Sequence, residues 1–165
     1  MPTPTYELIA SATGNGSSDT LTISSIPATY TDLILVSKLK NASGGAVTAP
    51  TLHYNGDFTS GNYSGVRLGA SSTVDDERDT TYQYPMWSSD LEFSASTVHI
   101  MNYSSTAIRK SAISISGAAT SGTDLIRIFT GVWRNTAAIN SVTLFNSSVA
   151  FTNNSTITLY GIKAS

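Results

Sequence analysis

The sequence predicts an all-β protein, an antiparallel, jelly-roll-like β-sandwich of about eight or nine strands with little or no helix. Three observations lead to this prediction. β-Branched and aromatic residues alternate with polar residues at a period of two in many segments. Clusters of Asn, Ser, Thr and Gly separate these segments at intervals of roughly ten residues, which is the spacing of a sandwich. No segment combines helical periodicity with capping residues.

Four strands are expected in the first third of the chain, at residues 6–10, 21–26, 32–40 and 52–54. Pro27 ends the second strand because proline cannot donate a hydrogen bond to a β-ladder. The third strand carries Leu33, Leu35 and Leu39 on one face, and its first half is apolar on both faces. We therefore expect the third strand to lie near the centre of a sheet.

Residues 58–90 form a long surface loop region in this interpretation, because only residues 66–68 have the pattern of a strand. The region contains an acidic cluster, which consists of Asp75, Asp76, Glu77 and Asp79. It also contains an aromatic cluster, which consists of Tyr82, Tyr84 and Trp87. Loops of this length inside a compact domain are commonly functional.

Five further strands are expected at residues 91–102, 109–116, 125–133, 139–145 and 156–162. In the first two of these, Val98 and Ile100, and then Ile113 and Ile115, are expected to face the core.

The strand at residues 125–133 has two different faces. The face that we assign to the core consists of Ile126, Ile128 and Val132. The opposite face consists of Arg127, Phe129 and Trp133. Because two aromatic side chains and a charge suit a contact surface better than open water, we expect this second face to be a second contact surface.

The composition restricts the class of protein. A chain of 165 residues is long enough for one domain with a real core, so residues 1–165 are expected to form a single domain. A net charge of −2 with scattered Lys and Arg argues against binding to nucleic acid or to an anionic membrane. The absence of cysteine excludes disulfides and thiolate zinc sites. No signal peptide and no membrane-spanning run is visible, so we expect a soluble protein made in the cytoplasm.

The sequence gives little support for catalysis, a cofactor or a metal. There is no Gly-x-Ser-x-Gly motif and no phosphate-binding glycine motif. Asp90 and Glu92 share one face of a strand, whereas a glycosidase pair usually faces across a cleft. The acidic cluster matches no calcium loop and contains Arg78, so we expect a solvated loop there. His53 and His99 lie on predicted strands and are interpreted as structural residues.

The aromatic cluster allows two interpretations. Tyr82, Tyr84 and Trp87 could stack on the rings of a glycan, with the neighbouring carboxylates binding its hydroxyls. They could equally pack against a second subunit, because Tyr and Trp are enriched at protein interfaces. We favour the interface. For Phe129 and Trp133 we favour packing in the core or in an interface over ligand binding.

Six segments resemble a family of small β-sandwich domains in structural proteins of tailed bacteriophages. These are TYELIAS (5–11), SSIPATYTDLILV (24–36), HYNGD (53–57), NYSGVRL (62–68), GVWRNTAAINSVTLF (131–145) and STITLYGIKAS (155–165). They consist of strand and turn residues and lie at both ends of the chain and in between, while residues 69–91 match only loosely. The resemblance implies a fold and a place on a virion surface, and it implies no catalytic residues.

From the resemblance we expect a virion structural protein, made in the host cytoplasm, that acts as a capsid decoration (cement) protein or a short head fibre. A chain that starts at its own Met1 and has no shaft of repeats fits these better than a complete tail fibre. We expect a homotrimer that docks on the major capsid protein or on tail proteins, with residues 1–5 as a docking arm. The alternative is a tail-fibre module that binds a receptor or carbohydrate on the host surface.

Overall fold

The computed structural model describes residues 5–42, 47–70, 74–79, 86, 88–89, 91–119, 124–147 and 149–163, with the backbone alone at residues 70 and 74–79. Within these residues the chain forms eleven strands and one short 3-10 helix, η1 (Ser60–Asn62). All paired strands run antiparallel. The prediction of an all-β sandwich with little or no helix is confirmed, and every predicted strand overlaps an observed one. The jelly-roll type and the single domain remain predictions.

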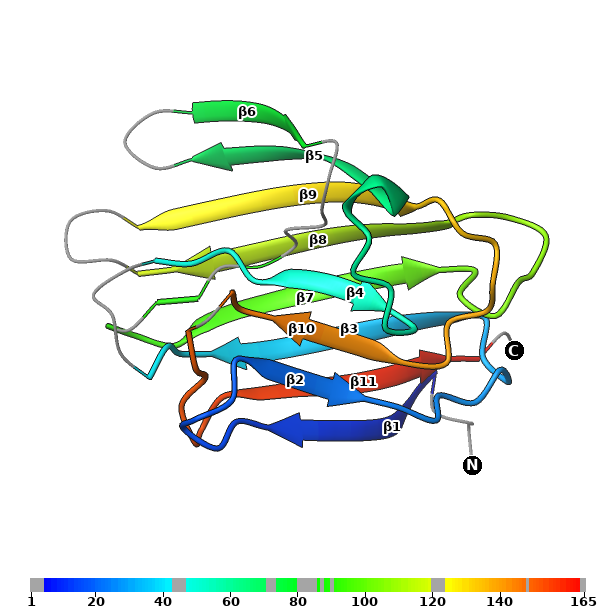
Figure 1. The fold of residues 1–165 in the computed structure, drawn as a ribbon, viewed down its shortest axis with the longest axis horizontal. Helices are drawn as coiled ribbons and strands as arrows, with labels where there is room; N and C mark the ends of the chain where they lie inside the picture. Colours follow the sequence, from blue (N-terminus) through cyan, green and yellow to red (C-terminus); the bar gives the residue numbers. More distant parts are fainter. Residues whose placement is uncertain are drawn as a thin grey trace.

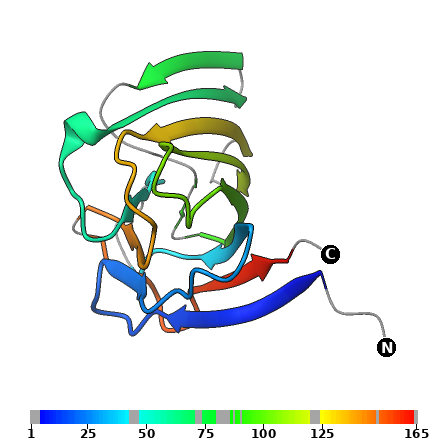
Figure 2. The same cartoon turned by 90° about the vertical axis from the view of Figure 1, so that its right-hand side faces the viewer.

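The strands build two sheets that face each other. The large sheet has eight strands in the order β1 (Tyr6–Thr13), β11 (Thr156–Ile162), β3 (Asp32–Leu39), β7 (Ser94–Met101), β8 (Lys110–Ala118), β9 (Leu125–Trp133), β5 (Tyr63–Ala70) and β6 (Val74–Asp79). The small sheet has three strands in the order β2 (Thr20–Ile23), β10 (Val142–Phe145) and β4 (Thr51–Tyr54). The large sheet curves, and the small sheet lies on its concave side (Figures 1 and 2).

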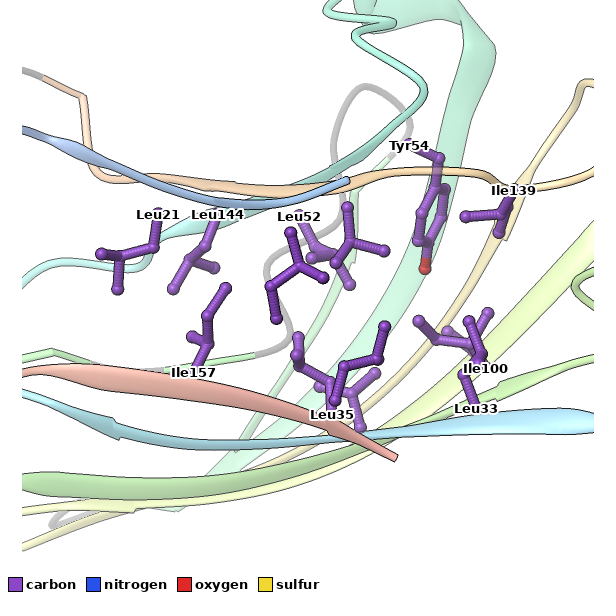
Figure 3. Packing of buried hydrophobic residues seen from close by; sticks show 14 of the residues in the cluster. Leu21, Leu33, Leu35, Leu52, Tyr54, Ile100, Ile139, Leu144 and Ile157 are labelled. Carbon is purple, nitrogen blue, oxygen red and sulfur yellow. The ribbon is translucent and has the colours of Figure 1, made fainter. Parts of the chain in front are cut away.

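The main core lies between the two sheets. Leu21, Leu52 and Leu144 point down from the small sheet toward Leu35 and Ile157 of the large sheet (Figure 3). All five of these side chains are almost completely buried. Val98 and Ile100 on β7 also face this core, as predicted, and so do Leu33, Leu35 and Leu39, which share one face of β3. The central place of β3, between β11 and β7, is confirmed as well.

A second part of the interior is aromatic. The ring of Tyr54 lies 5.6 Å from that of Trp133 and 6.2 Å from that of Tyr63, measured between centroids. These three side chains and Phe129 are buried. Large aromatic side chains each bury 150–250 Å², so a cluster of this kind contributes strongly to packing.

The two faces of β9 are the reverse of those predicted. Phe129 and Trp133 are each 1% exposed and point inward, whereas Ile126 and Ile128 are 58% and 44% exposed. Phe129 fits inside because Gly65 and Gly131, which are paired across β5 and β9, leave room for its ring. The expectation that Phe129 and Trp133 form a contact surface is therefore wrong, and the alternative of packing in the core holds.

The faces of β8 are also reversed. Ser114 and Ser116 point inward, and Ile113 and Ile115 point outward with 44% and 61% of their surface exposed. The ladder requires this phase, because Ser114 lies opposite the buried Phe129 and Ile115 lies opposite the exposed Ile128. The prediction that Ile113 and Ile115 face the core is wrong.

Residues 58–90 are not a continuous loop. Residues 63–70 form β5, which pairs with β9, and residues 74–79 form β6, which pairs with β5 at the edge of the large sheet. The acidic cluster therefore lies on a strand, which the sequence did not indicate because Asp and Glu are depleted in strands. The backbone ladder to β5 holds this acidic segment in place.

The contact between Phe129 and the two glycines gives the first testable prediction. A Cβ atom at Gly131 would overlap the Phe129 ring, so Gly131→Ala should lower the free energy of unfolding by about 1–3 kcal/mol. Gly61→Ala is the matched control, because nothing lies within 4 Å of a Cβ atom at that position. Urea unfolding of both variants measures the difference. Equal unfolding midpoints for the two variants would contradict the packing of Phe129 described here.

Candidate interaction surface

The convex face of the large sheet carries a group of exposed aliphatic side chains. We use the term outer face for the outward-pointing side chains of β3, β7, β8, β9 and β5. Seven of its aliphatic side chains are between 41% and 61% exposed: Val36, Val66, Leu68, Ile113, Ile115, Ile126 and Ile128. Monomeric soluble proteins rarely expose a large contiguous apolar patch, and such patches commonly mark contact sites.

The strand register places these side chains side by side. One row across the sheet consists of Val36, Thr97, Ile115, Ile128 and Leu68. The next row consists of Ile34, His99, Ile113, Thr130 and Val66. Because residues opposite each other in a ladder have Cβ atoms about 4.5–5.5 Å apart, each row forms a continuous strip.

The outer face has a ridge beside a hollow. Over β7 the outward side chains Ala95 and Thr97 are short, and they leave a hollow of about 370 Å³ between Val36 and Ile115. A second hollow of about 160 Å³ continues along β7 past His99. The isoleucines of β8 and β9, with Val66 and Leu68 of β5, stand beside these hollows and form the ridge.

The outer face carries little charge. On the described outward positions of its five strands the ionisable residues are Asp32, Lys38 and His99. The Nε2 atom of His99 lies 2.9 Å from the Oδ2 atom of Asp32, so these two residues satisfy each other. Lys38 lies near the end of β3, with its ammonium group 4.2 Å from the centroid of the Phe93 ring. The centre of the face is thus neutral and apolar.

The two histidines have structural partners, as predicted. His99 bonds to Asp32, and His53 is buried between the Thr51 hydroxyl, at 2.7 Å, and the carbonyl oxygen of Asp57, at 3.1 Å. The His53 ring also stacks on Phe58 with centroids 4.2 Å apart. Burial lowers the pKa of His53. His53 is buried, whereas His99 lines the second hollow of the outer face.

A buried lysine holds two loops together. The ammonium group of Lys110 donates hydrogen bonds to the carbonyl oxygens of Ser105, Ile108 and Thr136, at 2.6, 2.7 and 3.0 Å. The residue is fully buried, and desolvation lowers the pKa of its ammonium group. Three carbonyl partners use all of its donors, so Lys110 serves packing and not chemistry.

The Asp57 carboxylate fixes the aromatic part of the interior. It accepts hydrogen bonds from the Trp133 indole at 2.8 Å, from the Asn62 side chain at 2.8 Å and from the backbone N–H of Thr59 at 3.0 Å. Burial tends to raise the pKa of the Asp57 carboxyl, but the hydrogen bonds outweigh this effect and hold the pKa below its usual value. Asp57 therefore stabilises the fold as an anion.

Several predicted site residues lie outside the described part of the chain. These are the aromatic cluster Tyr82, Tyr84 and Trp87, and Asp90 of the Asp90–Glu92 pair. The side chains of the acidic cluster are not described either, although their backbone forms β6. Within the described residues no group of three or more His, Asp or Glu could hold a metal ion. No helix in that part of the chain is long and apolar enough to cross a membrane.

Comparisons with known proteins yielded no match to a family model, to a curated protein or to a solved structure.

Sequence reasoning missed the outer face itself. The available signal was the segment of residues 111–116, where isoleucine alternates with serine or alanine, but the alternation alone does not say which face is buried. The geometry of this face is therefore the main structural indication of function.

The Asp57 carboxylate gives a prediction about pH. Because the pKa of Asp57 is lower in the folded protein than in the unfolded chain, its contribution to stability is complete above a pH of about 4 and is lost as the pH falls through the folded pKa. Asp57→Asn removes the anion and should lower the stability at neutral pH by about 1.5–3 kcal/mol. It should also make the stability less dependent on pH below about 5. Thermal unfolding between pH 2 and pH 7 measures both effects.

Asp124→Asn is the control, because Asp124 is an exposed aspartate at the start of β9. This variant should keep the wild-type pH profile. If Asp57→Asn and the wild type lose stability over the same acidic range and by the same amount, Asp57 does not stabilise the fold as an anion.

Proposed function

We propose that this chain is a structural protein of a tailed-bacteriophage virion, a capsid decoration protein or short head fibre that acts on the particle surface as a symmetric trimer. The observation that carries the assembly part of this proposal is the outer face, with its seven half-exposed aliphatic side chains on a continuous sheet. The virion setting rests on the six segments of sequence that resemble phage structural proteins.

The use of the ionisable groups supports a structural role over an enzymatic one. Asp57, Lys110 and His53 form hydrogen bonds with other groups of the fold, and His99 bonds to Asp32. The hollows over β7 are shallow and are lined by Ala, Val, Ile, Ser, Thr, Gly and one His. A general acid or base must reach a substrate atom; Lys110 and His53 are buried, and His99, which lines a hollow, is bonded to Asp32.

The position of β1 supports docking through the N-terminal residues, of which residues 1–4 lie outside the described part of the chain. Tyr6 on β1 pairs with Ile162 on β11, so the start of β1 and the end of β11 lie side by side at the same end of the molecule (Figure 1). β5 and β6 lie at the opposite edge of the large sheet from β1. A molecule held on a particle through residues 1–5 can therefore present β5 and β6 away from the attachment point.

The mechanism is stabilisation by mass action. A decoration protein that binds the assembled shell, and not the free subunits, shifts the equilibrium toward the shell. At a free concentration of 100 times Kd, each occupied site contributes about 2.7 kcal/mol to the stability of the lattice. The contribution requires no chemical step, which agrees with a fold whose polar side chains serve packing.

Immunogold electron microscopy of intact particles, with antibody against the purified chain, tests the virion setting. We expect label distributed over the head. Particles from which the chain is absent should lose their genome at a lower temperature, and addition of the purified chain should restore the wild-type value. Label at the tail tip would contradict a decoration role and favour a receptor-binding role. If no particle carries label, the chain has no role on the virion.

A further inference from the structure

We propose that the outer face of the large sheet is the contact between copies of this chain. The inference deepens the proposed function, because it names the surface through which the oligomer forms. It rests on the self-assembly part of that proposal and is independent of the virion setting. Of the other candidates for a contact surface in the sequence, Phe129 and Trp133 are buried inside the chain and cannot serve, while Tyr82, Tyr84 and Trp87 lie outside the described residues.

The reversed polarity of β8 supports a contact through the outer face. Its inward positions hold Ser114 and Ser116, each 2% exposed, while its outward positions hold Ile113 and Ile115. Packing against Phe129 accounts for the small inward Ser114 but not for isoleucine at the outward positions, where polar side chains would suit an isolated molecule better. The order present in this strand is favourable when a second surface covers the isoleucines. The same holds for β9, where Ile126 and Ile128 point outward.

The lack of charge at the centre of the outer face indicates which kind of partner can cover it. A surface that binds a charged partner needs complementary charge, whereas the centre of the outer face carries none, and Asp32 and His99 satisfy each other at its side. Two identical neutral surfaces can approach without the like-charge repulsion that identical charged surfaces would experience. A second copy of this chain therefore fits the face better than nucleic acid or an acidic or basic protein does.

The shape of the outer face also suits a contact between copies. The ridge formed by Ile115, Ile128 and their neighbours stands beside the hollow of about 370 Å³ over β7. A copy can place its ridge in the hollow of one neighbour and receive the ridge of another in its own hollow. A head-to-tail contact of this kind forms a ring with cyclic symmetry when the rotation between neighbours closes, and a trimer is such a ring.

The apolar area of the outer face can be compared with the area that a specific contact needs. A fully buried aliphatic side chain removes roughly 60–120 Å² of apolar surface from water, so the seven half-exposed side chains supply roughly 200–400 Å² per copy. A specific contact needs about 1,000 Å² in total from both partners, or about 500 Å² from each. In a head-to-tail ring each contact buries the ridge of one copy and the hollow of the next, so these side chains supply roughly 200–400 Å² of that total and neighbouring surface must supply the rest.

A charge-pair variant tests this surface. In Ile115→Lys/Ile128→Glu the two new side chains lie opposite each other across β8 and β9. Their opposite charges support the strand pairing, so the fold is retained while two charges enter the proposed contact. Loss of a contact of this kind typically corresponds to about a 30-fold or larger rise in the dissociation constant. The matched control is Leu91→Glu/Ile108→Lys, which changes two similarly exposed apolar residues that lie outside the outer face.

Size-exclusion chromatography with light scattering gives the mass of each species, and circular dichroism reports the fold. We expect a wild-type and a control oligomer and a folded monomeric charge-pair variant at micromolar concentration. A folded charge-pair variant that keeps the wild-type mass would overturn the outer face as the contact, while leaving assembly and the virion role standing. A monomeric wild type would overturn both the contact and the trimer, and immunogold labelling would still test the virion role.

A labelling experiment covers the case in which the charge-pair variant does not fold. The chain contains no cysteine, so Thr97→Cys introduces a single thiol in the hollow over β7. In the oligomer this thiol should react with maleimide at least ~10-fold more slowly than after dilution to the monomer, because the ridge of a neighbour covers it. Thr106→Cys, in an exposed loop, is the control and should react equally fast in both states. Equal rates for Thr97→Cys in both states would overturn the proposal.

Discussion

The phase of β9 is the constraint on which the rest of the structure depends. The Trp133 indole donates to the Asp57 carboxylate at 2.8 Å and packs beside Tyr54, so Trp133 must point inward. Because side chains alternate along a strand, Phe129 then points inward too, and Ile128 points outward. The ladders to β8 and β5 extend this phase to both neighbouring strands. A slip of one residue would turn every one of these side chains to the opposite face.

Packing inside the sheet explains why the isoleucines of β8 cannot point inward. Phe129 occupies the space over Gly65 and Gly131, and its neighbour in the β8 ladder is Ser114. A small side chain beside a large one fills an interior layer without overlap, whereas an isoleucine in place of Ser114 would overpack it. The exposed aliphatic ridge is therefore the counterpart of the buried aromatic cluster. Both follow from the same register.

The sequence was sufficient for the fold class and for the approximate place of most strands, because alternation and turn residues are local signals. It was sufficient for the central place of β3, whose first half is apolar on both faces. It failed for β9, where Ile128 and Phe129 are neighbours and either phase gives an apolar face. That choice depends on Gly65 and Asp57, which are distant in sequence from β9. It also missed β6, whose acidic residues carry no strand signal and whose pairing comes from β5.

The edges of the large sheet bear on the proposed association through its outer face. An exposed sheet edge invites pairing with another chain, and proteins suppress this with charged residues and bulges. β6, at one edge, has the sequence Val-Asp-Asp-Glu-Arg-Asp. β1, at the other edge, has a register shift between Leu8 and Ala10 that interrupts its ladder. Both edges thus carry features that oppose open-ended growth by strand addition. The outer face carries no comparable protection at its centre, and a sequence that guards its edges but leaves a neutral aliphatic face exposed is suited to a closed oligomer.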